Sequence, residues 1–193
     1  LIALDVGLAR IGVAVCDPLR LVVRPLTILT RKSRREDFDA LARIVKGSRV
    51  DGIVLLGSDN DDAQLDLLTE ARFPFVRIGR HEFRPDLLSV DTDNAQASYD
   101  AVVHLIGQGH AKIGYACGPR GLTSTWDRLE GYDRAMREAG VAIDREWMLE
   151  AEWVQANAFR AMSLFMGQPD RPTALVVGDD TLAIGVLQAL TEL

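Results

Sequence analysis

The 193 residues include 22 Lys and Arg against 28 Asp and Glu, which gives a formal net charge of −6. This acidic balance argues against broad non-specific binding of nucleic-acid backbones, because such binding depends on clustered basic side chains. The hydrophobic content of 48% and charged content of 26% are ordinary for a globular protein, and no apolar run approaches the roughly 20 residues that span a bilayer.

Two cysteines, Cys16 and Cys117, have neither CxxC spacing nor a histidine cluster beside them. We expect both to be buried free thiols, as is usual in a reducing cytosol. The sequence therefore predicts a cytoplasmic protein that does not use a membrane as a partner.

The first residues predict a meander of three strands. Leu1–Asp5 and Ile11–Cys16 are apolar segments on either side of Gly7, which suits a tight hairpin. Leu21–Leu29 offers a third strand. Because Pro25 has no N–H for a sheet ladder, we expect this strand at an edge.

A helix is predicted to begin at Ser33, where Ser33 and Glu36 have the spacing of a capping box. Beyond it, Asp51–Leu56 is apolar on both faces, as buried parallel strands are. We expect this strand to pair in parallel with Leu1–Asp5. Asp59 and Asp62 are expected to cap the next helix.

From Asp51 onward, strands and helices alternate, which is typical of βαβ units and a mainly parallel sheet. The later strands are predicted at Phe75–Ile78, Ser89–Thr92, Lys112–Cys117, Met148–Trp153 and Ala174–Val177. The later helices are predicted after an Asn94 cap, at Asp127–Ala139, at Ala156–Met166 and at Leu182–Leu193.

Five motifs occur in a characteristic order in the second part of the chain. They are Ser89–Asn94, Gly109–Ile113, Arg128-Leu-Glu-Gly-Tyr132, Glu152-Trp153 and Val176–Asp180. This order resembles the effector-binding domain of LacI-type bacterial repressors, which are relatives of the periplasmic sugar-binding proteins. The resemblance covers roughly Val50 to Leu193. It implies a type I periplasmic-binding-protein-like α/β fold of two lobes, with mainly parallel sheets in three layers.

In that family the arginine of the RxxGY motif reaches the bound effector, and Arg128 matches it. Its guanidinium offers five N–H donors in a rigid fork, which suits vicinal hydroxyls or an acid. The alternative is a surface arginine paired with Asp127 or Glu130. Ser124 is a further candidate from the same helix, and it competes with its threonine neighbours.

Asp179 matches an Asn or Asp that the family places at a strand end, where open α/β sheets bind ligands. Its alternative role is a helix N-cap, although Asp180 is expected to fill that position better. Trp153 aligns with an aromatic residue that packs on the effector in some members, and plain core packing is its alternative.

A second resemblance concerns the first 48 residues. Ile2–Gly7, Arg10–Ala14, Asp17-Pro18 and Pro25-Leu26 are similar to the start of YqgF/RuvX-type resolvases, which have an RNase H-like fold. There the residue matching Asp5 helps to hold a divalent metal such as Mg²⁺. Because clamping two metal ions needs several carboxylates, Asp5 alone does not make a nuclease site.

We therefore expect a chimera with an RNase H-like antiparallel meander at its start. Residues 1–90 would form the N-lobe, divided into an RNase H-like part (1–48) and a LacI-like part (49–90). Residues 91–193 would form a C-terminally truncated C-lobe. The expected function is a non-catalytic effector-binding module for a sugar or nucleoside-like molecule, lacking a DNA-binding headpiece. The alternatives are a metal-dependent nuclease and an inactive chimeric scaffold.

The binding residues of this hypothesis are Arg128, Asp179, Trp153 and Ser124, with no cofactor, no metal and no direct nucleic-acid partner.

The last helix adds an expectation about assembly. Its apolar residues include Leu182, Ile184, Val186, Leu187, Leu190 and Leu193. Since they surround much of the helix, uncovered apolar surface is expected to drive formation of a homodimer.

Overall fold

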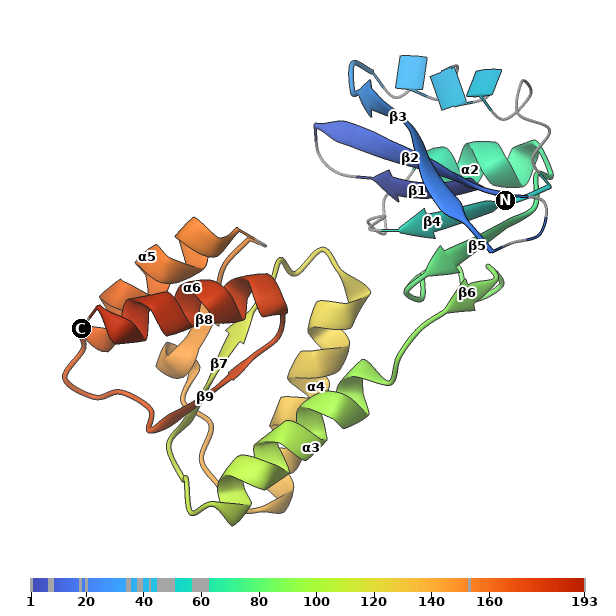
Figure 1. Cartoon of the computed structure of the whole chain (residues 1–193). Coiled ribbons are helices and arrows are strands. Elements are labelled where there is room, and N and C mark those ends of the chain that lie inside the picture. Colours follow the sequence, from blue (N-terminus) through green and yellow to red (C-terminus); the bar gives the residue numbers. More distant parts are fainter. Residues whose placement is uncertain are drawn as a thin grey trace. The chain divides into compact units, whose positions relative to one another are not determined.

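Figure 1 shows the computed structural model of the chain. It describes residues 2–6, 9–17, 19, 21–33, 36–37, 40–41, 43–44, 51–56, 63–152 and 154–192. These residues form two compact units, Leu1–Thr92 and Asp93–Leu193.

The first unit is built on a six-stranded sheet of order β3-β2-β1-β4-β5-β6. Its strands are β1 (Ile2–Val6), β2 (Arg10–Cys16), β3 (Val23–Thr30), β4 (Ile53–Leu56), β5 (Phe75–Ile78) and β6 (Ser89–Val90). β1, β2 and β3 pair antiparallel, whereas β4, β5 and β6 continue the sheet in parallel from β1. The predicted meander and the parallel pairing of β4 with β1 are both confirmed.

β3 lies at an edge of this sheet, as Pro25 predicted. Pro25 pairs with Ala14 at a register shift between Val13 and Ala14, which is where a strand can accept a residue without an N–H. The expected hairpin glycine, Gly7, lies outside the described residues.

One of the two hydrogen bonds of the predicted capping box is present: the amide of Glu36 donates to the hydroxyl of Ser33 at 3.2 Å. The proposed caps of the next helix, Asp59 and Asp62, lie outside the described residues. That helix is α2 (Ala63–Glu70). The core of the unit joins buried residues of the sheet and helix, among them Ile2, Leu4, Ile11, Val13, Ile53, Leu55, Leu65 and Leu68.

The second unit has a three-stranded parallel sheet of order β8-β7-β9. Its strands are β7 (Ile113–Cys117), β8 (Met148–Glu150) and β9 (Ala174–Val177). Its helices are α3 (Asn94–Gly107), α4 (Thr123–Glu138), the 3-10 turn η1 (Arg145–Trp147), α5 (Gln155–Met166) and α6 (Asp180–Thr191). α4 begins four residues before its predicted start, so Ser124 lies in the first turn.

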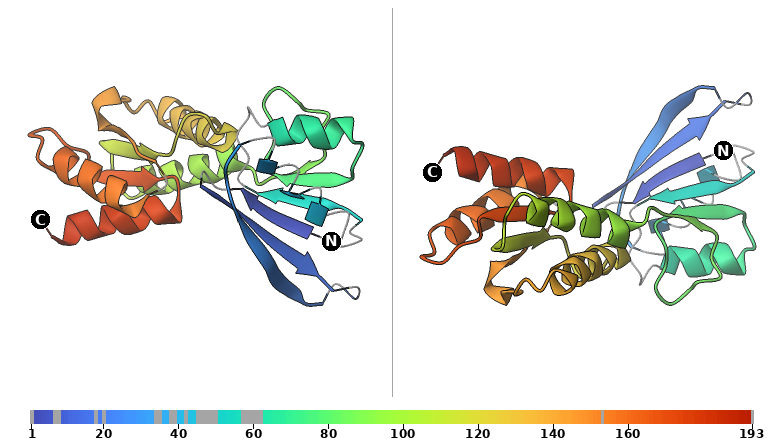
Figure 2. Two further views of the ribbon diagram at one scale, coloured as in Figure 1. Left: turned by 90° about the horizontal axis from the view of Figure 1, so that it is seen from above. Right: turned by 90° about the horizontal axis from the view of Figure 1, so that it is seen from below.

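Helices cover both faces of this sheet, and Figures 1 and 2 show α3 beside α4 and α5 beside α6. β9 shows why the sheet needs helices on both faces. Val176 packs in the core with α3 and α4, whereas its neighbours Leu175 and Val177 pack toward α5 and α6. Strand residues alternate between faces, so a strand that is apolar throughout requires three layers.

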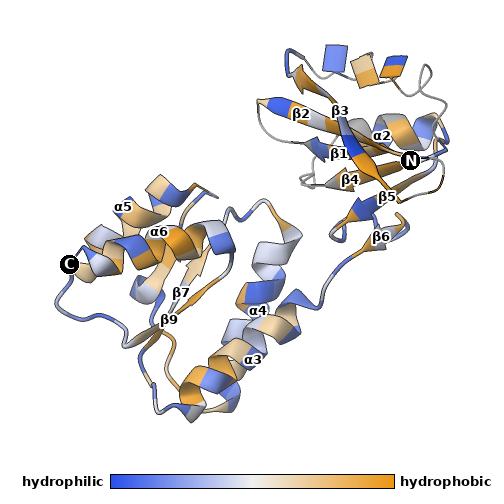
Figure 3. Ribbon diagram, in the orientation of Figure 1, coloured by the Kyte–Doolittle hydropathy of each residue, from blue (hydrophilic) through white to orange (hydrophobic). Residues whose placement is uncertain are grey.

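α6 carries apolar residues on both its buried and its exposed side, with polar residues among them (Figure 3). Leu182 and Val186 are buried, so the expectation that they contribute uncovered surface is wrong. They face inward because the helical repeat brings positions four apart to one side. Ile184, Leu187 and Leu190 remain 55%, 62% and 43% exposed. Leu193 lies outside the described residues.

Both cysteines are free, as expected. Cys117 is buried, and this burial raises the pKa of its thiol. Cys16 is only half-buried, so the prediction of a buried thiol is wrong at that position. In the part of the chain that the structure describes, no helix is both long and apolar enough for a membrane span.

Candidate functional site

Arg128 lies in the second turn of α4 and reaches groups from two other elements. Its Nε donates to Oδ1 of Asn94 at 3.0 Å, and its Nη1 donates to the carbonyl oxygen of Gly178 at 2.7 Å. Asn94 is the buried first residue of α3, and Gly178 follows β9. The guanidinium is therefore held at the carboxyl end of β9 by contacts with α3 and the strand end.

These contacts leave donors of the guanidinium for another molecule. Arginine has five N–H groups, and two of those of Arg128 are engaged. Within the described residues, its Nη2 amine makes no hydrogen bond. A planar fork whose orientation is already fixed loses little conformational freedom when it binds a hydroxyl pair or an acid.

Asp179 follows Gly178 directly and is the N-cap of α6. Its Oδ1 accepts from the amides of Thr181 at 2.7 Å and Leu182 at 3.4 Å. The expectation that Asp180 fills the cap is wrong: Asp179 has the extended backbone of a cap residue (φ −158°, ψ 151°), and Asp180 is already helical. For Oδ2 of Asp179, no partner is found in the described part of the chain.

Ser124 precedes Arg128 by four residues and therefore lies on the same side of α4. It is half-buried, whereas Thr123 and Thr125 are buried. This exposure distinguishes Ser124 from its two neighbours as a contact for a ligand. Trp153 lies outside the described residues, so its role stays a prediction.

A buried tyrosine lies near the anchored arginine. Burial raises the pKa of Tyr115, while the positive charge of Arg128 acts in the opposite direction. A Cβ atom added at Gly178 would lie 3.4 Å from the hydroxyl oxygen of Tyr115, so this hydroxyl is close to the strand end. The phenol is thus neutral and is positioned beneath the turn that carries Gly178 and Asp179.

Sequence reasoning missed Asn94 as a site residue and assigned it to a helix cap. The cap of α3 is Asp93, whose Oδ1 accepts from the amide of Gln96 at 2.8 Å. Asn94 follows the cap, and its Oδ1 accepts from Nε of Arg128. The sequence did contain a signal for this: Asp93 and Asn94 are both cap-type residues, and one helix end needs only one of them, so the other can make a different contact.

Asp5, the residue of the nuclease alternative, is exposed on β1 in the first unit. Its partners across the sheet are Gly12 and Leu56, neither of which is acidic. Among the residues that the structure describes, no three His, Cys, Asp or Glu side chains gather where they could hold a metal ion.

Comparison with known proteins places this geometry in a family. Residues 25–192 match the family described as periplasmic binding proteins and sugar binding domain of LacI family. The transcriptional repressor PurR of Klebsiella pneumoniae is 34% identical over 147 residues, which cover 75% of this chain and 43% of the repressor. The chain spans about half the length, or less, of the curated relatives it matches.

Solved structures of LacI-type regulators are similar to this chain as well. A LacI-type transcriptional regulator from Bacillus cereus subsp. cytotoxis aligns with a TM-score of 0.75 and 33% identity, covering 84% of this chain and 58% of that one. The regulator CelR in complex with cellobiose aligns with a TM-score of 0.72 and 29% identity, covering 81% of this chain and 49% of that one. The comparisons do not support the resolvase resemblance of the first residues. The chain belongs to the family of periplasmic binding proteins and LacI-type sugar-binding domains.

Proposed function

We propose that this chain is the effector-binding module of a LacI-type transcriptional regulator and that its effector is a sugar or a nucleoside-like molecule. Family membership supports the module, and the cellobiose complex of CelR supports a polyhydroxylated ligand. The observation that carries the proposal is Arg128, anchored by Asn94 and Gly178 at the carboxyl end of β9.

The chemistry of the strand end suits hydroxyl groups. Arg128 would donate from its unengaged Nη2, and Asp179 would accept through Oδ2 while its Oδ1 caps α6. Ser124 would add a hydroxyl from the same side of α4. Trp153 would cover the apolar face of a sugar or base ring. Donors and an acceptor placed together in this way fit adjacent hydroxyls better than a purely anionic or purely apolar ligand.

Titration calorimetry with sugars, including cellobiose, and with nucleosides tests the proposal. We expect a dissociation constant on the order of 1 mM, equivalent to about −4 kcal/mol, since each hydrogen bond competes with water. Arg128→Ala should abolish binding. Arg160→Ala is the matched control, because Arg160 is an exposed arginine on α5. Unchanged affinity in both Arg128→Ala and Asp179→Ala would place the ligand elsewhere.

We propose that the module acts by binding and not by catalysis, and that it does not contact nucleic acid directly. The net charge of −6 supports the second point, because like charges repel a phosphate backbone. We also propose that residues 1–48 form an RNase H-like start within an N-lobe of residues 1–90, with the C-lobe at 91–193.

A nuclease assay tests the non-catalytic role. Branched DNA incubated with the chain and Mg²⁺ should stay intact. Cleavage that disappears in Asp5→Asn would contradict the non-catalytic role.

We propose further that the chain forms a homodimer through α6. Ile184, Leu187 and Leu190 expose apolar side chains along this helix, and exposed apolar surface of this kind favours a self-complementary contact. Sedimentation should show a dimer for the parent chain and a monomer for Leu187→Glu. A monomer in both cases would exclude this interface.

A further inference from the structure

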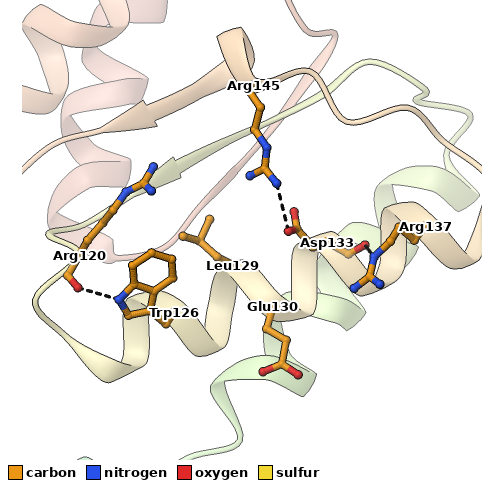
Figure 4. A pocket seen from close by; sticks show the side chains of 7 residues that line it. All are labelled: Arg120, Trp126, Leu129, Glu130, Asp133, Arg137 and Arg145. Atoms are coloured by element: carbon orange, nitrogen blue, oxygen red, sulfur yellow. Dashed lines mark hydrogen bonds and ion pairs between the residues drawn. The ribbon is translucent and has the colours of Figure 1, made fainter. Parts of the chain in front are cut away.

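A cavity of about 550 Å³ lies alongside α4 in the second unit. This volume is within the range of small-molecule sites. Three arginines line it: Arg120 from the segment after β7, Arg137 from the end of α4 and Arg145 from η1. Asp133 and Glu130 are its acidic residues. Figure 4 shows Glu130 directed away from Arg145, so Asp133 is the carboxylate among the guanidinium groups.

The cavity and the site around Arg128 lie on opposite sides of α4. Trp126, Glu130, Asp133 and Arg137 are spaced by four, three and four residues, so they share one side of the helix. At about 100° per residue, Arg128 projects roughly 160–220° away from that side. A molecule in the cavity therefore does not occupy the proposed effector position.

Two of the three guanidinium groups are brought together by Asp133. Arg145 Nη2 lies 3.4 Å from Oδ2 of Asp133, and Arg137 Nε donates to the backbone carbonyl of Asp133 at 3.1 Å. Arg145 also donates from Nη1 to the sulfur of Met148 at 3.2 Å. Within the described residues, the two terminal amines of Arg137 make no hydrogen bond. The carboxylate of Asp133 thus pairs with Arg145, whereas Arg137 is held at the backbone carbonyl of the same residue and keeps the N–H donors of its two terminal amines for an anion.

The other end of the cavity is formed by apolar side chains, and a hydrogen bond fixes the position of its tryptophan. The indole N–H of Trp126 donates to the carbonyl oxygen of Arg120 at 2.7 Å, and the Arg120 guanidinium lies 5.5 Å from the ring centroid. Arg120 is in turn bound to Glu150 at 2.9 Å. Trp126 is nevertheless 46% exposed, and Leu129 lies between it and Asp133 (Figure 4). This end therefore offers a fixed apolar surface.

We propose that this cavity is a second binding site, for a small organic anion. Its phosphate or carboxylate group would lie between Arg137 and Arg145, and its apolar or aromatic part would rest on Leu129 and Trp126. The site is independent of the effector site in position, because its residues on α4 lie on the other side of that helix from Arg128.

Calorimetric titration of the full chain with phenyl phosphate, benzoate, inorganic phosphate and benzyl alcohol tests the proposal. The two aromatic anions should bind with dissociation constants on the order of 1 mM, and inorganic phosphate more weakly. Neutral benzyl alcohol should not bind measurably. Comparison of phenyl phosphate with benzoate determines whether the anionic group is a phosphate or a carboxylate.

Arg137→Gln should weaken binding of the aromatic anions by roughly tenfold or more, the usual effect of losing a hydrogen bond to a charged group. Arg145→Gln should do the same, although Arg137 gives the cleaner test because Arg145 also pairs with Asp133. Trp126→Phe should leave the affinity for inorganic phosphate unchanged. Arg160→Gln is the control for net charge, and circular dichroism checks that each variant folds.

Arg128→Ala should retain phenyl phosphate binding, which separates this proposal from the effector hypothesis. Absence of binding at about 10 mM of either aromatic anion would overturn the second site. Equal affinity in the parent chain, Arg137→Gln and Arg145→Gln would overturn it as well.

Discussion

Gly131 allows α4 to approach α3 closely, and its replacement by alanine should destabilise the second unit. A Cβ atom built at Gly131 falls on the carbonyl oxygen of Ala95 and lies 2.9 Å from the carbonyl carbon of Ala95 and 3.0 Å from the amide nitrogen of Tyr99. These are backbone atoms of α3. No side-chain rotation relieves the overlap, so one helix must move.

Two effects of opposite sign decide the outcome of Gly131→Ala. Alanine favours an interior helical position over glycine by about 1 kcal/mol. Overpacking costs about 1–3 kcal/mol, and contact with a rigid backbone belongs at the upper end of that range. We therefore expect the free energy of unfolding to fall by about 2 kcal/mol. Helix propensity alone would predict an increase.

Urea denaturation followed by far-UV circular dichroism measures this change. Gly107→Ala is the matched control, because Gly107 is the last residue of α3 and a Cβ there would meet no atom within 4 Å. That variant should be neutral or more stable by up to about 1 kcal/mol. If Gly131→Ala is as stable as Gly107→Ala, the close approach of α3 and α4 does not hold in solution.

Three further predictions concern the same unit. Asp179→Ala should cost about 1 kcal/mol of unfolding free energy through the lost cap, and Asp180→Ala about 0.3 kcal/mol; equal losses in thermal denaturation would contradict the cap assignment. Burial raises the pKa of Tyr132 from 10.0 to about 12, so its stabilising contribution is complete below pH 10 and is lost as the pH rises toward 12. Tyr132→Phe should remove this part of the pH dependence of unfolding, at a cost of about 1 kcal/mol for the hydrogen bond to the carbonyl of Ile113; an unchanged pH profile would refute the assignment. Thr125 carries a buried hydroxyl without a partner among the described residues, so Thr125→Val should stabilise the chain by up to about 1 kcal/mol in urea denaturation, and a clear loss would reveal a hidden partner.

Much of the fold was predictable from local patterns. Pro25 placed β3 at an edge, and the apolar segment Asp51–Leu56 predicted a parallel strand beside β1. These features depend on backbone donors and on the alternation of side chains along a strand, which a short stretch of sequence already contains. The exposure of α6 was predicted less well, because local pattern does not say which side of an apolar helix is covered.

The site was only partly predictable, and two errors had one cause. Asp93-Asn94 and Asp179-Asp180 are adjacent pairs of cap-type residues, and the prediction chose the second residue of each pair. The structure uses the first residue of each pair as the cap. Which of two neighbours has the extended backbone depends on how the chain enters the helix from the preceding segment, and residue preference does not encode this.

The sequence by itself determined the family and the alternation of strands and helices, and it placed Arg128 and Gly131 within one motif, because motif order and hydrophobic period are local properties. Only the tertiary structure decided what these two residues contact. Arg128 binds Asn94 and Gly178, which lie 34 and 50 residues away along the chain. Gly131 meets the backbone of α3. Contacts over such separations form only when helices and strands pack, because burial of the apolar faces sets the distances between polar groups carried by different elements.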